Sequence, residues 1–301
     1  MTDDLAGLYG PASEAWRLNR EATLLLGAGP RALLLQIAHP LIAEGVDQHS
    51  DFRTDPWRRL RATLRSYLAI VYGTTTEARA EIRRLHGLHR RIHGPAREAA
   101  RLAGDAARYD ARDPDLALWV HATLIDATLV THQAWIRPLG PDQRARFYAE
   151  TRPIGRALGI PEERLPRNIA AFDAYLAEQL GPDGPLRVTP TARSLAEVIL
   201  APPLGPLHPL LGRVPVSSYA WLLWPAVGLL PATIRNAYGL RWGRRERLVA
   251  GWLVAGLRAW RPLLPADWRT MPQALDADAR LAGRLRGGLR PAAASVPADP
   301  C

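Results

Sequence analysis

Residues 115–135, DLALWVHATLIDATLVTHQAW, form a long apolar stretch that follows directly on Asp113-Pro114. Proline at the first position of a helix already has a helical φ, and it lacks only an N–H that the helix would leave unpaired. Four residues recur along one side of the stretch at helical spacing: His121, Ile125, Thr128 and His132. The stretch therefore predicts a long helix that carries two histidines on one side.

Helical signals of the same kind run along most of the chain. Further helix starts are marked at Asp55-Pro56 and Gly140-Pro141, and the pair Gly94-Pro95 is typical of a helix end. Alternating patterns typical of strands are hard to find. The sequence therefore predicts an all-α fold.

The composition along the chain suggests one domain. No internal repeat and no linker between two regimes of composition interrupts it. We predict an N-terminal extension over residues 1–19, a single large helical domain over residues 20–285, and a flexible Ala/Pro-rich tail over residues 286–301.

The segment LLLGAGPRALLLQ, residues 24–36, contains the spacing G-x-G-x-x-A of a dinucleotide-binding turn. Gly27, Gly29 and Ala32 fill that spacing, and Asp51 follows about twenty residues later. Such a turn needs a strand before it and a parallel βαβ unit after it. The preceding residues have helical periodicity instead, so we favour a Gly-Pro turn between two helices.

The stretch EIRRLHGLHRRIHG, residues 81–94, contains His86, His89 and His93. At 3.6 residues per turn, offsets of three and seven residues put all three imidazoles on one face of a helix. Histidine is the commonest neutral metal ligand, which indicates a metal or redox role. The alternative is a solvated basic helix, because four arginines alternate with the histidines: Arg83, Arg84, Arg90 and Arg91.

Several catalytic classes lack their residues. The single cysteine, Cys301, is the last residue of the chain, which excludes a disulfide and a thiolate-ligated metal within one protomer. Paired Glu-x-x-His motifs, H-E-x-x-H and G-x-S-x-G are absent. Imidazole chemistry remains, which suits haem iron or a mononuclear histidine-rich site. The N-terminus does not resemble a secretory signal, so we expect a cytoplasmic protein.

The uncharged stretch over residues 214–234 is long enough to span a bilayer. Pro215, Pro225 and Pro231 interrupt it, which is unfavourable for a lone helix in lipid. We favour a broken, buried hairpin, and a peripheral membrane contact through these residues is the alternative.

The helix predicted after Asp55-Pro56 carries Arg58, Arg59, Arg61 and Arg65, and the chain has a formal net charge of +10 with every basic residue an arginine. A solvated surface helix or a phosphate-binding patch would explain these arginines. No nucleic-acid-binding motif accompanies them, so we expect no nucleic-acid partner. Arg59 and Thr63 lie one turn apart, so together they offer a cation and a hydroxyl to an oxygen-bearing ligand.

Several ordered motifs between about residues 20 and 245 resemble the rubber oxygenase catalytic domain family, which includes latex-clearing proteins and mpaB-type oxygenases. The motifs are RALLLQIAHPLIAEGVDQHSDF, DPWRRLRATL, LHGLHRRIHG, DPDLALWVHATLIDA and LLPATIRNAYGLRW. The resemblance implies an all-α fold that holds a b-type haem in a buried pocket, with one histidine as the proximal ligand and dioxygen on the other side.

Matched motif by motif, the resemblance implies that His89 is the iron ligand, and that Arg59 and Thr63 are the distal residues that approach bound dioxygen. His39 and His121 fall in further shared motifs and are expected to line the haem pocket. Rubber-cleaving members carry a lysine just before the distal threonine, where this chain has Ala62, so cleavage of polyisoprene is not expected. Two carboxylates near the distal arginine are candidates for a catalytic base: Glu44 and Asp47.

The leading hypothesis is therefore a haem-b-dependent oxygenase that uses O2 to oxidise or cleave a small apolar substrate, such as an isoprenoid or another alkene. The first alternative is a haem-binding sensor or carrier without catalysis. The second is a basic helical module that binds acidic lipid or nucleic acid. The sequence does not indicate an oligomeric state.

Overall fold

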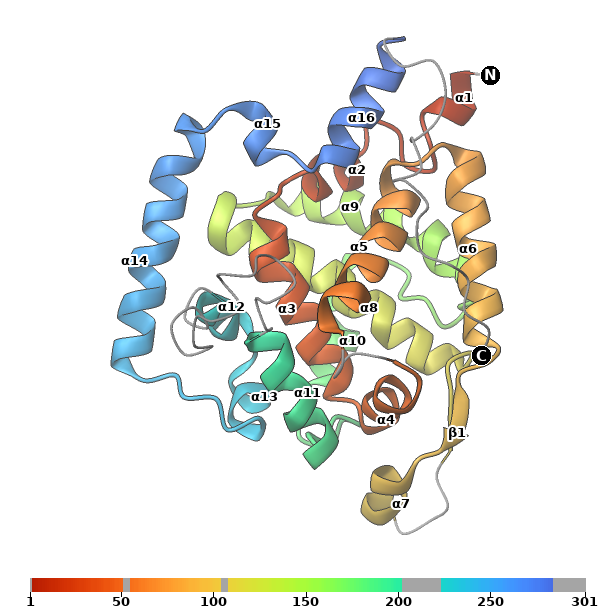
Figure 1. The fold of residues 1–301 in the computed structure, drawn as a ribbon, viewed down its shortest axis with the longest axis vertical. Coiled ribbons are helices and arrows are strands. Elements are labelled where there is room, and N and C mark those ends of the chain that lie inside the picture. Colours follow the sequence, from red (N-terminus) through yellow and green to blue (C-terminus); the bar gives the residue numbers. More distant parts are fainter. Residues whose placement is uncertain (1, 51–54, 104–107, 202–222, 284–301) are drawn as a thin grey trace.

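The computed structural model describes residues 2–50, 55–103, 108–201 and 223–283. These residues form helices joined by short connections, apart from one two-stranded ribbon (Figure 1). The all-α prediction is confirmed. The longer helices are α3 (Leu24–Ile37), α4 (Pro40–His49), α5 (Pro56–Tyr72), α6 (Thr75–His89), α8 (Pro114–Thr131), α9 (Pro141–Ala157), α10 (Ile169–Gln179), α11 (Pro190–Leu200), α14 (Arg244–Trp260) and α16 (Pro272–Leu281). The shorter ones are α1 (Thr2–Leu5), α2 (Glu14–Asn19), α7 (Arg97–Ala103), α12 (Trp224–Leu229), α13 (Ala232–Ala237) and α15 (Ala266–Arg269).

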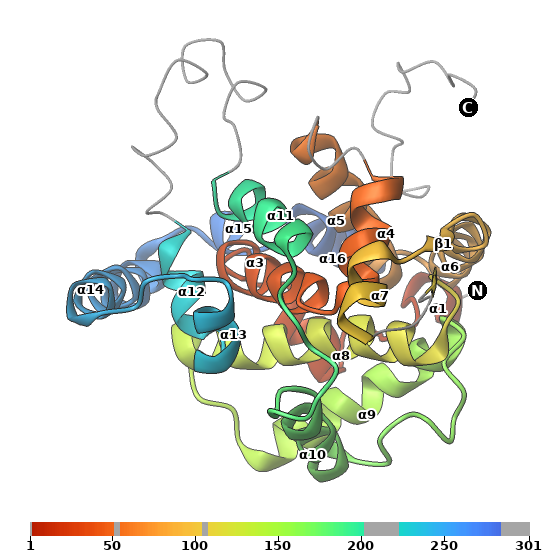
Figure 2. The same ribbon diagram turned by 90° about the horizontal axis from the view of Figure 1, so that it is seen from below.

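The long apolar stretch forms α8, which begins where the sequence indicates. The Asp113 carboxylate accepts a hydrogen bond of 2.8 Å from the Asp115 amide, and Pro114 is the first helical residue. At its carboxyl end α8 continues into a π-helical turn, His132–Ile136. Most residues of α8 are buried, because α3 packs along one side of it and α9 along another (Figure 2).

The contact between α3 and α8 depends on Gly27. A Cβ atom at this position would lie 2.5 Å from Thr131 Cγ2 and 2.7 Å from the Trp135 ring. Both Gly27 and Gly29 lie inside α3, which continues through Pro30 to Ile37. The predicted Gly-Pro turn is wrong, and so is the alternative of a dinucleotide-binding turn, because this segment is helical. Glycine is required at position 27 because α3 and α8 pack closely there.

A buried ion pair also joins α3 to α8. The Arg31 guanidinium donates to Asp126 Oδ2 from Nη2 at 2.5 Å and from Nε at 3.0 Å, and it also donates to the Leu229 carbonyl. Burial raises the pKa of Asp126, although the neighbouring Arg31 opposes that shift. Both charged groups lie in the interior, so each depends on the other for compensation.

The largest apolar cluster extends from the α3 and α8 pair to α9, α10 and α11 and to the short helices α12 and α13. A second cluster joins α2, α5 and α16 around Trp16 and Tyr72, whose rings meet edge to face at 4.9 Å. Trp16 and Leu18 are fully buried, so the N-terminal residues predicted as an extension contribute to both clusters. The predicted tail, residues 286–301, lies outside the described residues.

The described part of the uncharged stretch, residues 223–234, consists of α12 and the first residues of α13, with a break at Leu230-Pro231. Val227, Leu230 and Ile234 are buried in the main core, in line with the favoured reading of a broken, buried segment. Residues 214–222 lie outside the described residues. Among the helices described, none is by itself long and apolar enough to cross a membrane, and only α3 with α4, bent by 104°, meets the length and composition criteria as a pair.

Candidate functional site

Helix α5 carries Arg59 and Thr63. It starts at Pro56, where the Asp55 carboxylate accepts a 2.9 Å hydrogen bond from the Arg58 amide. One turn further on, Arg59 Nη1 donates to Thr63 Oγ1 at 2.5 Å, and Thr63 Oγ1 lies 3.0 Å from the Arg59 carbonyl that it donates to. The two side chains therefore lie on one face of α5, as their spacing predicts, and they are bonded to each other.

A second contact fixes the direction of the Arg59 side chain. Its Nε donates to Ser50 Oγ at 3.1 Å, which ties α5 to the end of α4. Arg59 has a large exposed area, but neighbouring atoms partly remove water from its guanidinium, and this desolvation lowers the pKa of Arg59 from its ordinary value. An arginine stays charged in spite of such a shift. The result is an oriented positive charge next to a hydroxyl, at the outer end of α5.

Helix α6 carries His89 as its last residue. The helix begins with a capping box, in which Thr74 Oγ1 accepts from the Glu77 amide and the Glu77 carboxylate accepts from the Thr74 amide. Beyond it, β1 (His93–Pro95) pairs antiparallel with β2 (Arg108–Asp110). The prediction that all three imidazoles lie on one helix face is therefore wrong. The helix ends at His89, and His93 lies in a strand instead.

The His89 ring is half-buried, and among the described residues no hydrogen bond engages either of its nitrogens. Burial lowers the pKa of His89 from 6.5, and the positive charges of His86, Arg59 and Arg84 act in the same direction. The imidazole is thus held neutral at neutral pH, which is the form that binds metal ions. Arg59, near the start of α5, is thus within electrostatic range of the end of α6.

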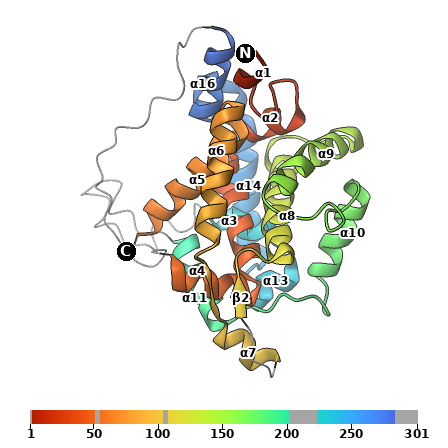
Figure 3. The same cartoon turned by 90° about the vertical axis from the view of Figure 1, so that its right-hand side faces the viewer.

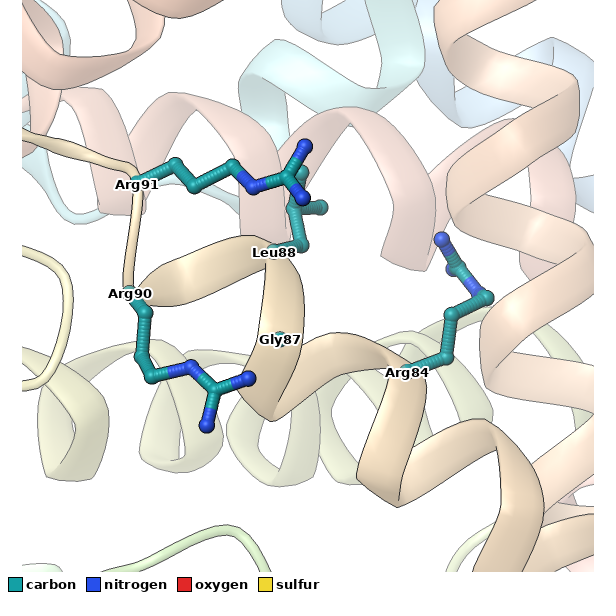
Figure 4. Close-up of a pocket in the computed structure, with 5 residues that line it drawn as sticks. All are labelled: Arg84, Gly87, Leu88, Arg90 and Arg91. Atoms are coloured by element: carbon teal, nitrogen blue, oxygen red, sulfur yellow. The ribbon is translucent and has the colours of Figure 1, made fainter. Parts of the chain in front are cut away.

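Arg84 links α6 to α5. Its Nη2 donates to Glu81 Oε1 at 2.6 Å and to Ser66 Oγ on α5 at 2.9 Å. Beside it lies an open cleft of about 350 Å³ on the last turn of α6, and its lining residues are Arg84, Gly87, Leu88, Arg90 and Arg91. Figure 4 shows the Arg91 side chain reaching across Leu88, with Arg84 projecting from the preceding turn and Arg90 directed the other way. This cleft combines an apolar floor with several guanidinium groups.

The cleft and the predicted residues do not form one enclosed cavity. Arg59, Thr63 and His89 do not line it. The described residues do not show the buried haem pocket that the resemblance implies, nor do they contain a group of three or more His, Cys, Asp and Glu side chains suited to hold a metal ion. A site with a single imidazole ligand would not form such a group.

The end of α9 contacts both histidine-bearing helices. Figure 3 shows α9 beside α8, with α6 on the other side of α8 in that view. His86 Nε2 lies 2.9 Å from the Ala157 carbonyl near the end of α9. His121, on α8, lies against the same end, since a Cβ atom at Gly155 would be 3.1 Å from His121 Nε2. The expectation that a second histidine helix faces the first is therefore met only through α9. His132 lies at the far end of α8, where Nδ1 is 3.3 Å from the Arg137 carbonyl.

His39 and His121 share an unusual state. His39 Nδ1 and His121 Nε2 are buried without a hydrogen-bond partner among the described residues. Burial lowers the pKa of each ring from 6.5 to about 4. Both rings are therefore neutral at neutral pH. No contact in the described residues brings either of them to His89, Arg59 or Thr63.

The two candidate carboxylates differ in their surroundings. Glu44 is buried, and its carboxylate accepts hydrogen bonds of 2.6, 2.6 and 3.1 Å from the amides of Arg97, Glu98 and Ala99. It thereby caps the first turn of α7 and holds it against α4. Glu44 is committed to that structural contact, while Asp47 lies half-buried further along α4.

Sequence reasoning did not find the parts that Arg84, Ser66 and His86 take in the site. Arg84 and His86 stand in the histidine-rich stretch, but their partners Ser66 and Ala157 are 18 and 71 residues away. Local spacing carries no signal for contacts at such separations.

The fold and these side chains define an all-α protein with an imidazole group at the end of α6 and an oriented guanidinium group near the start of α5. The chain belongs to the family described as "ER-bound oxygenase mpaB/B'/Rubber oxygenase, catalytic domain", whose family model matches residues 16–260. It is thus an enzyme of an oxygenase family, as the resemblance implied.

Two curated relatives are themselves uncharacterised proteins, from Mycobacterium bovis and Mycobacterium tuberculosis. Each is 28% identical over 242 residues, which cover 77% of this chain and 87% of the relative. No solved structure is significantly similar to the chain.

Proposed function

We propose that this protein is a haem-b-dependent oxygenase that acts on a small apolar substrate carrying an alkene, such as an isoprenoid, with His89 as the ligand of the iron. The observation that carries the proposal is the state of His89: a neutral imidazole without a hydrogen-bond partner among the described residues, within electrostatic range of Arg59, which is bonded to Thr63. When bound, haem supplies an iron centre that binds and activates O2.

The chain's own residues suit such a group. Among the described residues neither ring nitrogen of His89 has a hydrogen-bond partner, so one nitrogen can bind iron and the other can donate to an acceptor. Arg84, Arg90 and Arg91 around the open cleft offer planar guanidinium groups, which pair well with the two carboxylates of haem b. Leu88, which is 43% exposed, provides an apolar surface beside them.

Arg59 is proposed to act on the oxygen-bearing ligand, and Thr63 is proposed to hold Arg59 in position. Ser50 and Thr63 hold the guanidinium in one orientation, so little reorganisation is needed when negative charge develops nearby. The Thr63 hydroxyl is engaged with Arg59 on both its donor and acceptor sides, so its role is to position that charge. The neutral rings of His39 and His121 are proposed to lie in the pocket wall.

The substrate is proposed to be small because of position 62. Rubber-cleaving members have a lysine there, and this chain has a half-buried alanine. A pocket without that ammonium group is more apolar and lacks its control over the iron. The alanine at position 62 also fits a second candidate function, a haem-binding sensor or carrier that does not catalyse a reaction. Oxygen consumption in the presence of small alkenes distinguishes the two, because a carrier binds haem but consumes no oxygen.

The ligand assignment is tested by reconstituting the purified chain with haem and recording the absorption spectrum. We expect a Soret band in the wild type, and its loss or a marked shift in His89→Ala. His93→Ala is the matched control, since His93 is an exposed histidine in the adjoining strand and should leave the band unchanged. A band that is the same in His89→Ala and wild type would contradict the assignment.

A further inference from the structure

Helix α14 presents its apolar side to solvent. Figures 1 and 2 show it along the outer edge of the molecule, where it contacts α12 and the π-helical turn. Ala250 is its one buried residue, and Val254 and Leu257 lie on the same inner face. On the opposite face, at the same spacing, lie four exposed apolar residues: Leu248, Trp252, Ala255 and Ala259. A surface helix usually turns such a stripe toward the core.

The exposed apolar surface continues beyond α14. The 3-10 turn Arg261–Leu263 and α15 add further large side chains. Five large residues of this surface have more than 60% of their area exposed: Trp252 (79%), Trp268 (75%), Leu263 (72%), Trp260 (68%) and Leu248 (64%). Single exposed apolar residues are common, but this many along one edge indicate a surface that binds something.

Arginines flank this surface. Arg244, Arg245 and Arg247 are exposed on the first turn of α14, and in the described part of the chain no carboxylate forms an ion pair with them. The nearby Glu246 is engaged in the N-terminal cap, where its carboxylate accepts from the Gly243 amide at 2.7 Å. The surface is thus positively charged at the start of α14, and its large exposed side chains further along are apolar, with Arg258 and Asp267 as exposed charges among them.

We propose that the surface formed by α14, the 3-10 turn and α15 docks this protein on a negatively charged lipid bilayer. Each residue type on this surface suits one region of a bilayer. Tryptophan is favoured at the headgroup boundary, leucine inserts among the acyl chains, and arginine attracts anionic headgroups. The inference does not rest on haem or on any reaction.

Two other occupants fit the charges less well. A second copy of this chain carries the same arginines and the same formal net charge of +10, so it offers them no excess of negative charge. Residues 202–222 of this chain contain Arg213 and no acidic residue, so they offer the arginines no negative charge. An anionic surface is the partner that satisfies both parts of the patch.

The test is flotation of the full-length protein with lipid vesicles. We expect binding to vesicles of equimolar phosphatidylcholine and phosphatidylglycerol, weak binding to phosphatidylcholine alone, and a decrease with added salt. Trp252→Gln should weaken binding by about tenfold, since it removes a large apolar anchor. The pair Arg244→Gln and Arg245→Gln should weaken it by about fivefold for each arginine.

The matched control is the pair Arg79→Gln and Arg101→Gln, which removes the same charge from exposed positions on α6 and α7. It should bind as wild type does, and an equal loss would overturn the proposal by showing that net charge alone is responsible. Absence of binding to either vesicle would also overturn it. Sedimentation velocity then separates the other occupants: a dimer that Trp252→Gln dissociates indicates a second copy, and a monomer indicates cover by another part of the chain.

Discussion

The pair α3 and α8 and the pair α5 and α6 are both helix contacts, but they are built in opposite ways. The first closes over Gly27 and encloses the ion pair of Arg31 with Asp126. The second is joined by polar contacts such as that of Arg84 with Ser66, and it leaves the His89 ring without a hydrogen bond among the described residues. Stability is concentrated in the first pair, and groups available for chemistry are concentrated in the second.

Removing one partner of the buried ion pair should have the largest effect on the free energy of unfolding. Asp126→Ala leaves the Arg31 guanidinium uncompensated in the core, at an expected cost of about 3–5 kcal/mol. Urea unfolding followed by circular dichroism measures it. Asp173→Ala is the control, because it breaks a more exposed pair with Arg144 and should cost about 1 kcal/mol or less. Similar losses in the two variants would mean that the Arg31 pair is open to water.

The neutral histidines predict the next largest effect, a loss of stability in acid. Above pH 6.5 the His121 ring is neutral in the folded and unfolded chains. As the pH falls from 6.5 to about 4, the unfolded chain takes up a proton that the folded chain does not, so the free energy of unfolding falls. The shift corresponds to about 3 kcal/mol for His121, and burial of His39 acts in the same direction.

The measurement is the difference in stability between pH 7 and pH 5, from urea unfolding of wild type and variants. His121→Gln should show a smaller loss in acid than wild type, and His93→Gln, at an exposed strand position, should show the same loss. Asp126 acts in the opposite direction, because burial raises its pKa, but it is common to all three proteins. An unchanged pH dependence in His121→Gln would show that the ring is accessible to protons in the folded chain.

Gly27→Ala should destabilise the protein by about 2 kcal/mol, because the added methyl group meets Thr131 and Trp135 at less than 3 Å. Gly29→Ala is a matched control two residues along the same helix, where a Cβ atom meets nothing within 4 Å. That variant should be neutral or more stable by up to about 1 kcal/mol, from helix propensity alone. Thermal unfolding of both distinguishes close packing from a general effect of replacing glycine.

Sequence patterns predicted the helices well, because their signals are local. Pro56, Pro114 and Pro141 each begin a helix as expected, and apolar spacing identifies α8. The predictions of secondary structure were wrong where contacts with residues distant in the sequence determine the local conformation. Pro30 reads as a helix breaker, yet α3 continues through it because its flanks pack on α8, and His93 leaves the helical pattern because a strand more than ten residues later pairs with it.

The candidate site was predicted to a similar extent. That Arg59 and Thr63 share a helix face follows from a spacing of one turn, and the structure adds a hydrogen bond between them. The proximity of Arg59 to His89 depends on how α5 packs on α6, and the task of Glu44 depends on where α7 begins. Neither could be read from spacing within one segment. The resemblance to the family implied that Arg59, Thr63 and His89 belong to one site. Helical spacing alone predicted only that Arg59 and Thr63 share a face.

The smallest expected effect on stability is at the open pair of helices. Arg59→Gln removes exposed hydrogen bonds to Ser50 and Thr63, so the free energy of unfolding should fall by about 0.5 kcal/mol. If Arg59 acts on the oxygen-bearing ligand, the same variant should lower oxygen consumption of the haem-loaded protein by about a hundredfold. Arg61→Gln, an exposed arginine on another side of α5, should change neither quantity. A loss of stability as large as that of Gly27→Ala, or full retention of oxygen consumption, would show that Arg59 supports the fold instead of the chemistry, and the division between the two helix pairs would not hold.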